Sequence, residues 1–169
     1  MNMGDATPTP WDAQGNLEVL TFDLGDETFA LEAVLVCEIL DLLPCTAVPG
    51  ADPLVGSVVN YRGKIIPIAD LRRAFAMPQT DATLDSRVVV IAIELAGETI
   101  QVGLRTDKVH EVTTLRRDAS EAPPAVGMRW RRDYVRALVR RNQGVVVLPD
   151  LSAIFQVFAG DDAGVSTLH

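Results

Sequence analysis

The sequence predicts an all-β fold of two small barrels packed on each other, with a few short helices. Apolar runs rich in β-branched residues dominate the chain, and Gly, Pro and Asp interrupt them roughly every 8 to 12 residues, which is typical of a sandwich or barrel. Several motifs recur at nearly constant offsets, which indicates two copies of one β unit. A unit of this size buries too little surface to be stable alone, so the copies should pack together. Closing each unit into a barrel removes its exposed sheet edges.

Each unit is expected to open with a hairpin. Residues 18–24 alternate between two faces, which predicts a half-buried strand. The Gly25–Asp26 pair then supplies a tight turn, because glycine tolerates the positive φ of hairpin turns. The pattern returns in residues 88–95, which Ala96–Gly97 follows, and the Glu-Thr pairs after the two turns are 71 positions apart.

Two later segments repeat as well. They are residues 36–39, echoed 73 positions on by 109–112, and residues 66–71, echoed 80 positions on by 146–151. Asp70 and Asp150 hold equivalent places in the second pair, and each is positioned to cap a short helix. The order and spacing of these anchors predict a duplicated β unit.

The anchors also set the expected boundaries. A domain should span residues 17–158, with a first unit at about 17–76, a linker at 77–86, a second unit at about 87–156, and flexible tails at 1–16 and 159–169. The second unit carries an insertion around residues 116–132, where Pro123–Pro124 interrupts regular structure.

The charge of the chain is uneven. The formal net charge is −8, which opposes binding to nucleic acid and to anionic membranes. Yet eight arginines and three acids lie between Arg116 and Arg141, a local charge of +5, so the remainder carries −13.

Residues 129–141, here called the arginine strip, interleave arginines with aromatics as nucleic-acid binding proteins do. The alternation from Tyr134 to Val139 nevertheless describes an ordinary strand with one solvated side. Three alternatives stay open for the strip: an acidic protein partner, single-stranded nucleic acid, or a merely solvated face.

No catalytic, metal or cofactor site is expected. His110 and His169 are the two histidines, and His169 ends the chain, which argues against a histidine general base. The sequence has no H-E-x-x-H or C-x-x-C motif, no nucleophile elbow and no glycine-rich phosphate loop. Cys37 and Cys45 suit neither a disulfide framework nor a zinc site, and we expect reduced packing residues. The protein should not be an enzyme.

A cytoplasmic location is expected. Residues 1–16 are polar and lack the basic and apolar regions of a signal peptide. The longest apolar run, residues 88–93, has strand length and is far shorter than the roughly 18 residues needed to cross a bilayer.

The segment at residues 48–71 strongly resembles the most characteristic stretch of the CheW family; it reads VPGADPLVGSVVNYRGKIIPIADL. The family pattern there is P-G, a short turn, and then G-x-[IV]-N-x-R-G-x-x-[IV]-P-[IV]-x-D-L. The opening LTFDLGDETFAL, the segment VCEIL and the closing VVLPDL are also similar in order and spacing, so the match spans about residues 17–156. The resemblance implies two packed five-stranded SH3-like β-barrels (CheW-like).

The resemblance also implies a function. A CheW-like protein is a non-enzymatic adaptor, without a cofactor, that couples methyl-accepting chemoreceptors to a CheA-type histidine kinase whose regulatory domain is a homologous double barrel. The expected setting is a bacterial chemosensory array that serves chemotaxis, or twitching or surface-sensing signalling, with recruitment to the membrane through partners. The competing hypothesis is a double-barrel module that binds an acidic protein or single-stranded nucleic acid through the arginine strip.

Two sets of binding residues follow from the resemblance. The coiled-coil tip of a receptor would lie in a groove between the barrels, near Val36, Glu38, Asn60, Tyr61, Arg62 and Gly63. The kinase would pack on uncovered apolar residues at the barrel ends, namely Val58, Ile65, Ile66, Leu138, Val145 and Val147. We expect Glu38 and Arg62 to form an ion pair that orients the turn. The simpler alternative is that Asn60 and Gly63 only shape a turn and that the ion pair is a weak surface contact.

Three positions depart from the family pattern. Tyr61 stands where leucine is usual, and Ala137 and Val139 stand where the second unit usually has glycines near its last hairpin. The arginine-rich insertion is also heavier than the family norm. These differences predict an altered interface or a different partner at these places.

Overall fold

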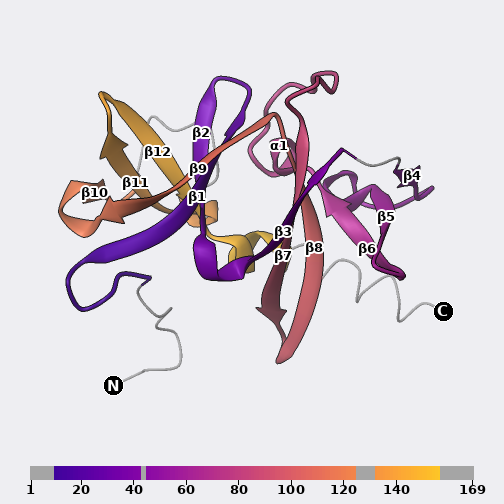
Figure 1. Ribbon diagram of the computed structural model, residues 1–169, viewed down its shortest axis with the longest axis horizontal. Coiled ribbons are helices and arrows are strands. Elements are labelled where there is room, and N and C mark those ends of the chain that lie inside the picture. Colours follow the sequence, from indigo (N-terminus) through magenta and orange to yellow (C-terminus); the bar gives the residue numbers. More distant parts are fainter. Residues whose placement is uncertain (1–9, 43–44, 125–131, 157–169) are drawn as a thin grey trace.

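The computed structural model describes residues 10–42, 45–124 and 132–156, and these form two six-stranded sheets that lie side by side (Figure 1). The first sheet contains, in spatial order, β10 (Ser120–Glu121), β11 (Val135–Arg141), β12 (Gly144–Pro149), β2 (Glu27–Glu32), β1 (Asn16–Leu24) and β9 (Lys108–Arg116). The second sheet contains β3 (Val36–Asp41), β7 (Arg87–Leu95), β8 (Glu98–Thr106), β6 (Lys64–Ala69), β5 (Ser57–Tyr61) and β4 (Thr46–Ala47). The all-β prediction is confirmed.

The helical segments are short and lie at the connections between strands. They are η1 (Ala33–Leu35), η2 (Pro53–Val55), α1 (Leu71–Ala74), η3 (Arg117–Ala119), η4 (Arg132–Tyr134) and a helix at residues 151–156. Asp70 Oδ1 accepts from the backbone N–H of Arg72 at 3.1 Å, and Asp150 Oδ1 accepts from that of Ala153 at 2.9 Å. Both predicted N-caps are confirmed, since each carboxylate satisfies a donor that its helix leaves unpaired.

The two sheets repeat one strand order. The order β10-β11-β12-β2-β1-β9 matches the order β4-β5-β6-β8-β7-β3 strand for strand when the strands are paired by their repeat equivalence. Each sheet has five longer strands and one strand of two residues, β10 or β4. The duplication in the sequence is therefore a duplication in the fold.

The strand pairing does not follow the predicted unit boundaries. β1 and β2 belong to the predicted unit 17–76 but join strands of the unit 87–156, and β7 and β8 make the reciprocal exchange. A single residue, Asp107, separates β8 from β9. Because a tight hairpin needs about two loop residues, the chain cannot turn back there and continues onto the other sheet. Neither predicted unit closes a sheet by itself.

Parallel strand pairs attach each exchanged hairpin to its sheet. β2 pairs with β12, where Phe29 lies beside Val147, and β6 pairs with β8, where Ile68 lies beside Gly103. A Cβ added at Gly103 would lie 2.6 Å from Ile68 Cδ1 and 2.8 Å from Val88 Cγ1. The second parallel pair therefore packs so closely that it requires glycine.

In the part of the chain that the structure describes, buried apolar side chains form three clusters. One belongs to the first sheet, around Val139, one belongs to the second, around Val90, and the largest takes side chains from both sheets. A run of aromatic rings crosses this shared cluster, with centroid distances of 5.7 Å for Phe22 and Phe29, 5.2 Å for Phe29 and Phe75, and 6.3 Å for Phe75 and Tyr134. The shared core confirms that the two sheets pack on each other.

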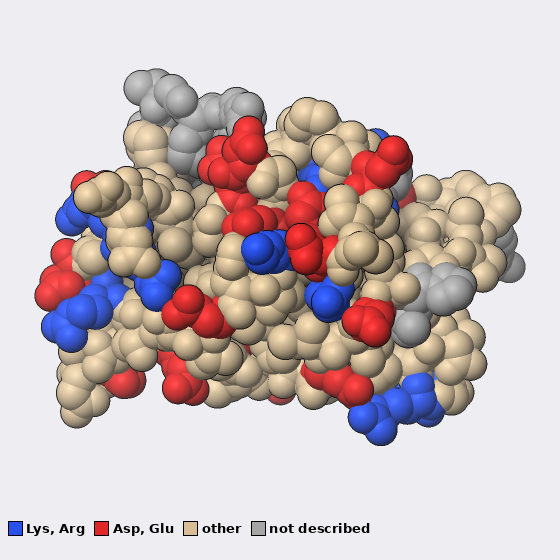
Figure 2. Space-filling view, turned by 45° about the horizontal axis from the view of Figure 1, so that its top comes forward, with Lys and Arg blue, Asp and Glu red and all other residues tan. Residues whose placement is uncertain are grey.

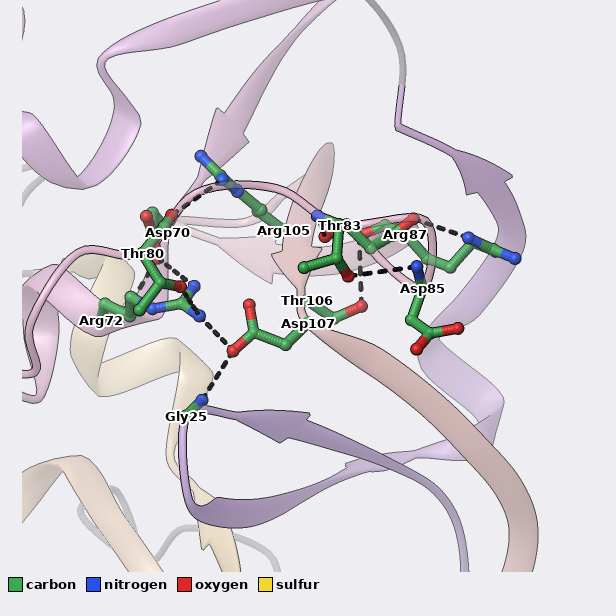
Figure 3. Close-up of polar contacts among 11 residues, drawn as sticks. Gly25, Asp70, Arg72, Thr80, Thr83, Asp85, Arg87, Arg105, Thr106 and Asp107 are labelled. Carbon is green, nitrogen blue, oxygen red and sulfur yellow. Dashed lines mark hydrogen bonds and ion pairs between the residues drawn. The ribbon is translucent and has the colours of Figure 1, made fainter.

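A buried arginine joins the two sheets at the point where the chain crosses between them (Figure 3). Arg72 of α1 is 1% exposed, and its Nη2 contacts the Asp107 carboxylate and donates to Thr80 Oγ1 at 3.0 Å. Asp107 Oδ2 also accepts from the backbone N–H of Gly25 at 2.7 Å, in the β1–β2 turn. A buried charge is tolerated only when it is paired and hydrogen-bonded, so this contact constrains α1, the linker and two turns together.

Replacing Asp107 with alanine should lower the free energy of unfolding by about 3 kcal/mol, because the Arg72 guanidinium would stay buried without its closest carboxylate. Urea unfolding measures the change. The matched control is Asp118→Ala, which removes an exposed carboxylate 3.5 Å from Arg116 and should cost less than about 0.5 kcal/mol. Equal losses in both variants would show that the buried junction contributes no more than a surface ion pair.

Candidate functional site

The β5–β6 hairpin ends in a two-residue turn at the surface. Its central residues, Arg62 and Gly63, have φ values of 52° and 81°, which is the backbone of the turns that match the twist of paired strands. The backbone N–H of Gly63 donates to Asn60 Oδ1 at 3.0 Å. Asn60 and Gly63 therefore shape the turn, as the simpler alternative for these two residues has it, and Arg62 occupies a conformation that a non-glycine residue rarely adopts.

Glu38, Tyr61 and Arg62 form a closed set of polar contacts beside this turn. Arg62 reaches Glu38 Oε1 with Nη2 at 2.6 Å and with Nε at 3.1 Å. The Tyr61 hydroxyl donates to the same oxygen at 2.9 Å and accepts from Arg62 Nε at 3.1 Å. The guanidinium also lies over the Tyr61 ring, 5.4 Å from its centroid, where a cation is attracted to the ring face. The predicted Glu38–Arg62 ion pair is present.

These contacts link opposite sides of the second sheet. β3, which carries Glu38, is one edge of the sheet, whereas β5, which ends at Tyr61, lies next to the other edge. The sheet must curl for the two to meet, so the three side chains close it where no backbone ladder does. The candidate site is thus part of the barrel closure.

The same contacts determine the charge of the site. Hydrogen bonds from Arg62 and then from Tyr61 lower the pKa of Glu38 below its ordinary value, because they stabilise the carboxylate. The Glu38 carboxylate in turn raises the pKa of Arg62. The side chain of Arg62 is 69% exposed. The site therefore presents a fixed guanidinium to solvent.

The first sheet carries a second version of this arrangement. Glu111 on β9 is the repeat equivalent of Glu38, and Arg141 at the end of β11 reaches its Oε2 at 3.5 Å and Thr113 Oγ1 at 3.0 Å. The following turn, at Asn142 and Gln143, again has positive φ values, 51° and 68°. Each sheet is thus closed by a glutamate held by an arginine.

The residues predicted at the barrel ends divide into exposed and buried ones. Ile65 is 66% exposed and Val145 is 50% exposed, and they are repeat equivalents on β6 and β12. Val36, Val58 and Leu138 are half-buried.

Ile66 and Val147 correct the prediction, because they are 3% and 1% exposed and belong to apolar clusters. Adjacent strand residues face opposite ways, so Ile66 points inward where Ile65 points outward. Both buried residues can only support a surface from within.

Among the described residues, five large exposed apolar residues lie outside the predicted site, and two of them lie on strands. Ile39 on β3 and Val112 on β9 are large and exposed, and they are repeat equivalents at an offset of 73. The signal that could have found them is an apolar residue at a solvent-facing strand position in both copies. Together with Ile65 and Val145, they give each sheet a pair of exposed apolar side chains.

Arginines of the strip that lie in described strands are paired with acids of the same chain. Arg136 contacts Glu32 at 3.1 Å, and Arg140 contacts Glu121 at 3.0 Å. On the face in Figure 2, acidic side chains gather over the middle of the molecule, and basic ones at the left end lie among acidic ones. Arg129, Trp130 and Arg131 lie outside the described residues.

The described ranges contain no group of three His, Cys, Asp or Glu residues that could hold a metal ion. Nor does any helix within residues 10–42, 45–124 and 132–156 have the length and apolarity to cross a membrane. Cys37 and Cys45 are not joined in a disulfide within the described residues, and both are exposed. The expectation of packing residues is therefore wrong, since β3 turns Cys37 outward.

A family model described as the CheW-like domain matches residues 18–159. The chain is 29% identical over 142 residues to the probable chemotaxis protein CheW of Rhizobium etli, which covers 84% of this chain and 89% of that protein. It is 24% identical over 137 residues to the chemotaxis protein CheW of Bacillus subtilis, covering 81% and 85%.

A solved structure shares the architecture. The crystal structure of the scaffolding protein TtCheW from Thermoanaerobacter tengcongensis matches with a TM-score of 0.72 and 26% sequence identity, over 83% of this chain and 92% of that one. The duplicated two-sheet fold agrees with the family match across residues 18–159. The chain belongs to the CheW-like domain family.

Proposed function

We propose that this chain is a non-enzymatic adaptor that couples methyl-accepting chemoreceptors to a CheA-type histidine kinase in a bacterial chemosensory array. The observation that carries the proposal is the exposed Arg62, which Glu38 and Tyr61 hold in place at a surface turn. Relatives named as chemotaxis proteins and a neighbour named as a scaffolding protein support a binding role. The adaptor acts in the cytoplasm and reaches membrane arrays through its partners, in chemotaxis or in twitching or surface-sensing signalling.

The proposed receptor surface consists of Val36, Glu38, Asn60, Arg62 and Gly63, and Tyr61, which is buried, supports it from beneath. Arg62 is fixed before any partner arrives, so binding costs little of its side-chain entropy. Glu38 Oε1 takes the Nε and Nη2 donors of Arg62, so the exposed guanidinium still offers its Nη1 side to a polar acceptor on the helical tip of a receptor. Half-buried Val36 lies on the same strand as Glu38 and adds apolar contact.

The proposed kinase surface is the apolar end of each sheet. Val58 and Ile65 supply it on the second sheet, and Leu138 and Val145 supply it on the first; Ile66 and Val147 lie beneath as buried support. An uncovered apolar patch on an otherwise charged protein marks an interaction site. A homologous barrel of the kinase regulatory domain offers the matching apolar end.

The alternative function, binding of polyanions or acidic proteins by the arginine strip, has weaker support. Arg136, Arg140 and Arg141 already contact carboxylates of this chain. An incoming anion would have to compete with these pairs, and the net charge of −8 would oppose a polyanion. The adaptor is therefore the function that we propose.

Arg62→Ala should weaken binding of a purified receptor cytoplasmic fragment by at least about 10-fold, on the scale of a central arginine in an interface. Binding of the kinase regulatory domain should not change. Biolayer interferometry with both partners from the same organism measures the two affinities. The matched control is Lys64→Ala, which removes a positive charge from the same hairpin. If both variants lose the receptor equally, general charge and not the Glu38–Arg62 contact governs docking.

Ile65→Asp should weaken binding of the kinase regulatory domain by about 10-fold, because it places a charge in an apolar contact. Binding of the receptor fragment should not change. The matched control is Leu84→Asp, since Leu84 is also exposed but lies in the linker between the repeats. Wild-type affinity for the kinase domain should change little between low and high salt. A steep loss with salt, or an unaffected Ile65→Asp variant, would contradict apolar docking at this end.

Tyr61→Phe should raise the pKa of Glu38 but leave it below its ordinary value, because the larger contribution comes from Arg62. A lowered carboxylate pKa stabilises the fold at pH above the unfolded value, and this stabilisation is lost as pH falls through the folded value. NMR titration of the Glu38 side-chain carboxyl carbon measures this pKa in the wild type and in the Tyr61→Phe variant. An unchanged pKa would mean that the phenol does not hold the carboxylate. The Arg62→Ala variant is the reference, because it should raise the pKa of Glu38 more than Tyr61→Phe does.

A further inference from the structure

A cavity of about 210 Å³ lies where the end of β12 meets β2, β7 and the helix at residues 151–156. These elements come together in the middle of the molecule in Figure 1, where η1 leads from β2 into β3. Its apolar lining comes from both sheets and includes Leu31, Leu35, Ile93, Leu148 and Leu151.

Charged side chains share this cavity with the apolar ones. Glu32, Glu94, Asp150 and Arg136 also line it, which gives the lining a net charge of −2 from three carboxylates and one guanidinium. Arg136 is held by Glu32 at 3.1 Å, and the Asp150 carboxylate caps the following helix. Glu94 is exposed on β7. The cavity therefore combines an apolar wall with excess negative charge.

A second cavity, lined by residues of the second sheet and of the linker, has the opposite charge. It measures about 460 Å³ and is lined by Ile68, Asp70, Arg73 and Arg105, a net charge of +1. Ile68 and Asp70 are the repeat equivalents of Leu148 and Asp150 at the offset of 80. The two cavities thus share these repeat positions but differ in the sign of their charge. The two do not suit the same ligand.

We propose that the 210 Å³ cavity receives an arginine side chain from the receptor segment that docks beside Val36. This inference rests on the proposed function. Leu35 lines the cavity and is directly followed by Val36, so the cavity continues the proposed receptor surface. A long basic side chain lays its aliphatic stem on apolar residues and keeps its charged head near carboxylates. Charge complementarity therefore favours this occupant over an acidic or purely apolar one.

The test uses Nα-acetyl-arginine methylamide as a probe, with the uncharged citrulline analogue of the same shape as its control. Methyl NMR of Ile93, Leu148 and Leu151 follows the titration. The arginine probe should shift these methyl signals with a dissociation constant on the order of millimolar, and the citrulline probe should not. Equal shifts with both probes, or none with arginine, would overturn the proposal.

Two variants give changes of opposite sign. Glu94→Gln should weaken binding of the arginine probe about 3-fold, because the net charge of the cavity lining changes from −2 to −1. Arg136→Gln should tighten binding of the same probe about 3-fold, because the substitution releases Glu32 from its ion pair. Glu98→Gln, an exposed acid on β8 outside the cavity, is the matched control and should change nothing. Arg136→Gln that binds more weakly would contradict the proposal, provided that its other methyl signals show an intact fold.

A receptor cytoplasmic fragment separates this inference from the proposed function. If the wild type binds the fragment and Glu94→Gln binds it equally well, the cavity does not take a receptor side chain and the inference falls. If the wild type does not bind the fragment but the arginine probe still enters the cavity, the proposed function fails, and with it the assignment of the occupant to a receptor. A 3-fold loss for Glu94→Gln, with Glu98→Gln unchanged, supports both.

Discussion

Asp107 lies at one of the points where the chain crosses from one sheet to the other, and its side chain ties that crossing to the rest of the molecule. It is the whole connection between β8 and β9, so the chain crosses to the other sheet instead of closing a hairpin. Its carboxylate also contacts the buried guanidinium of Arg72 and accepts from the backbone of Gly25. The crossing point is thereby fixed to α1 and to the first hairpin. Charge compensation depends on this position, because a buried guanidinium needs its carboxylate wherever the chain places it.

The candidate site follows from how the sheets close. Each sheet curls until a glutamate near one edge meets an arginine from the strand beside the other, Glu38 with Arg62 in one sheet and Glu111 with Arg141 in the other. Tyr61 adds a phenol to the first of these contacts and its ring lies under the guanidinium. Three hydrogen bonds join Arg62 and Tyr61 to Glu38 and hold the site in one arrangement. A partner therefore meets a surface that is already arranged.

Local features of the fold could be predicted from the sequence, and long-range ones could not. Alternation identified the strand around Phe22, and the position of Asp70 identified a helix cap, because both depend on near neighbours in the chain. Strand exchange could not be read in this way, since periodicity shows that a segment is a strand but not which strand lies beside it. Family resemblance identified the Glu38–Arg62 contact. In β12 three consecutive valines hide the alternation, so nothing in the sequence showed that Val147 is buried while Val145 is exposed.

The exchange of hairpins joins the two sheets into one packed unit rather than two bodies connected by a flexible linker. The two sheets share an aromatic core and are each completed by strands from both halves of the chain. Separating the two sheets would expose this shared core, and the short crossings at η1 and Asp107 also tie one sheet to the other. The shared core and these chain crossings therefore couple the position of one sheet to that of the other.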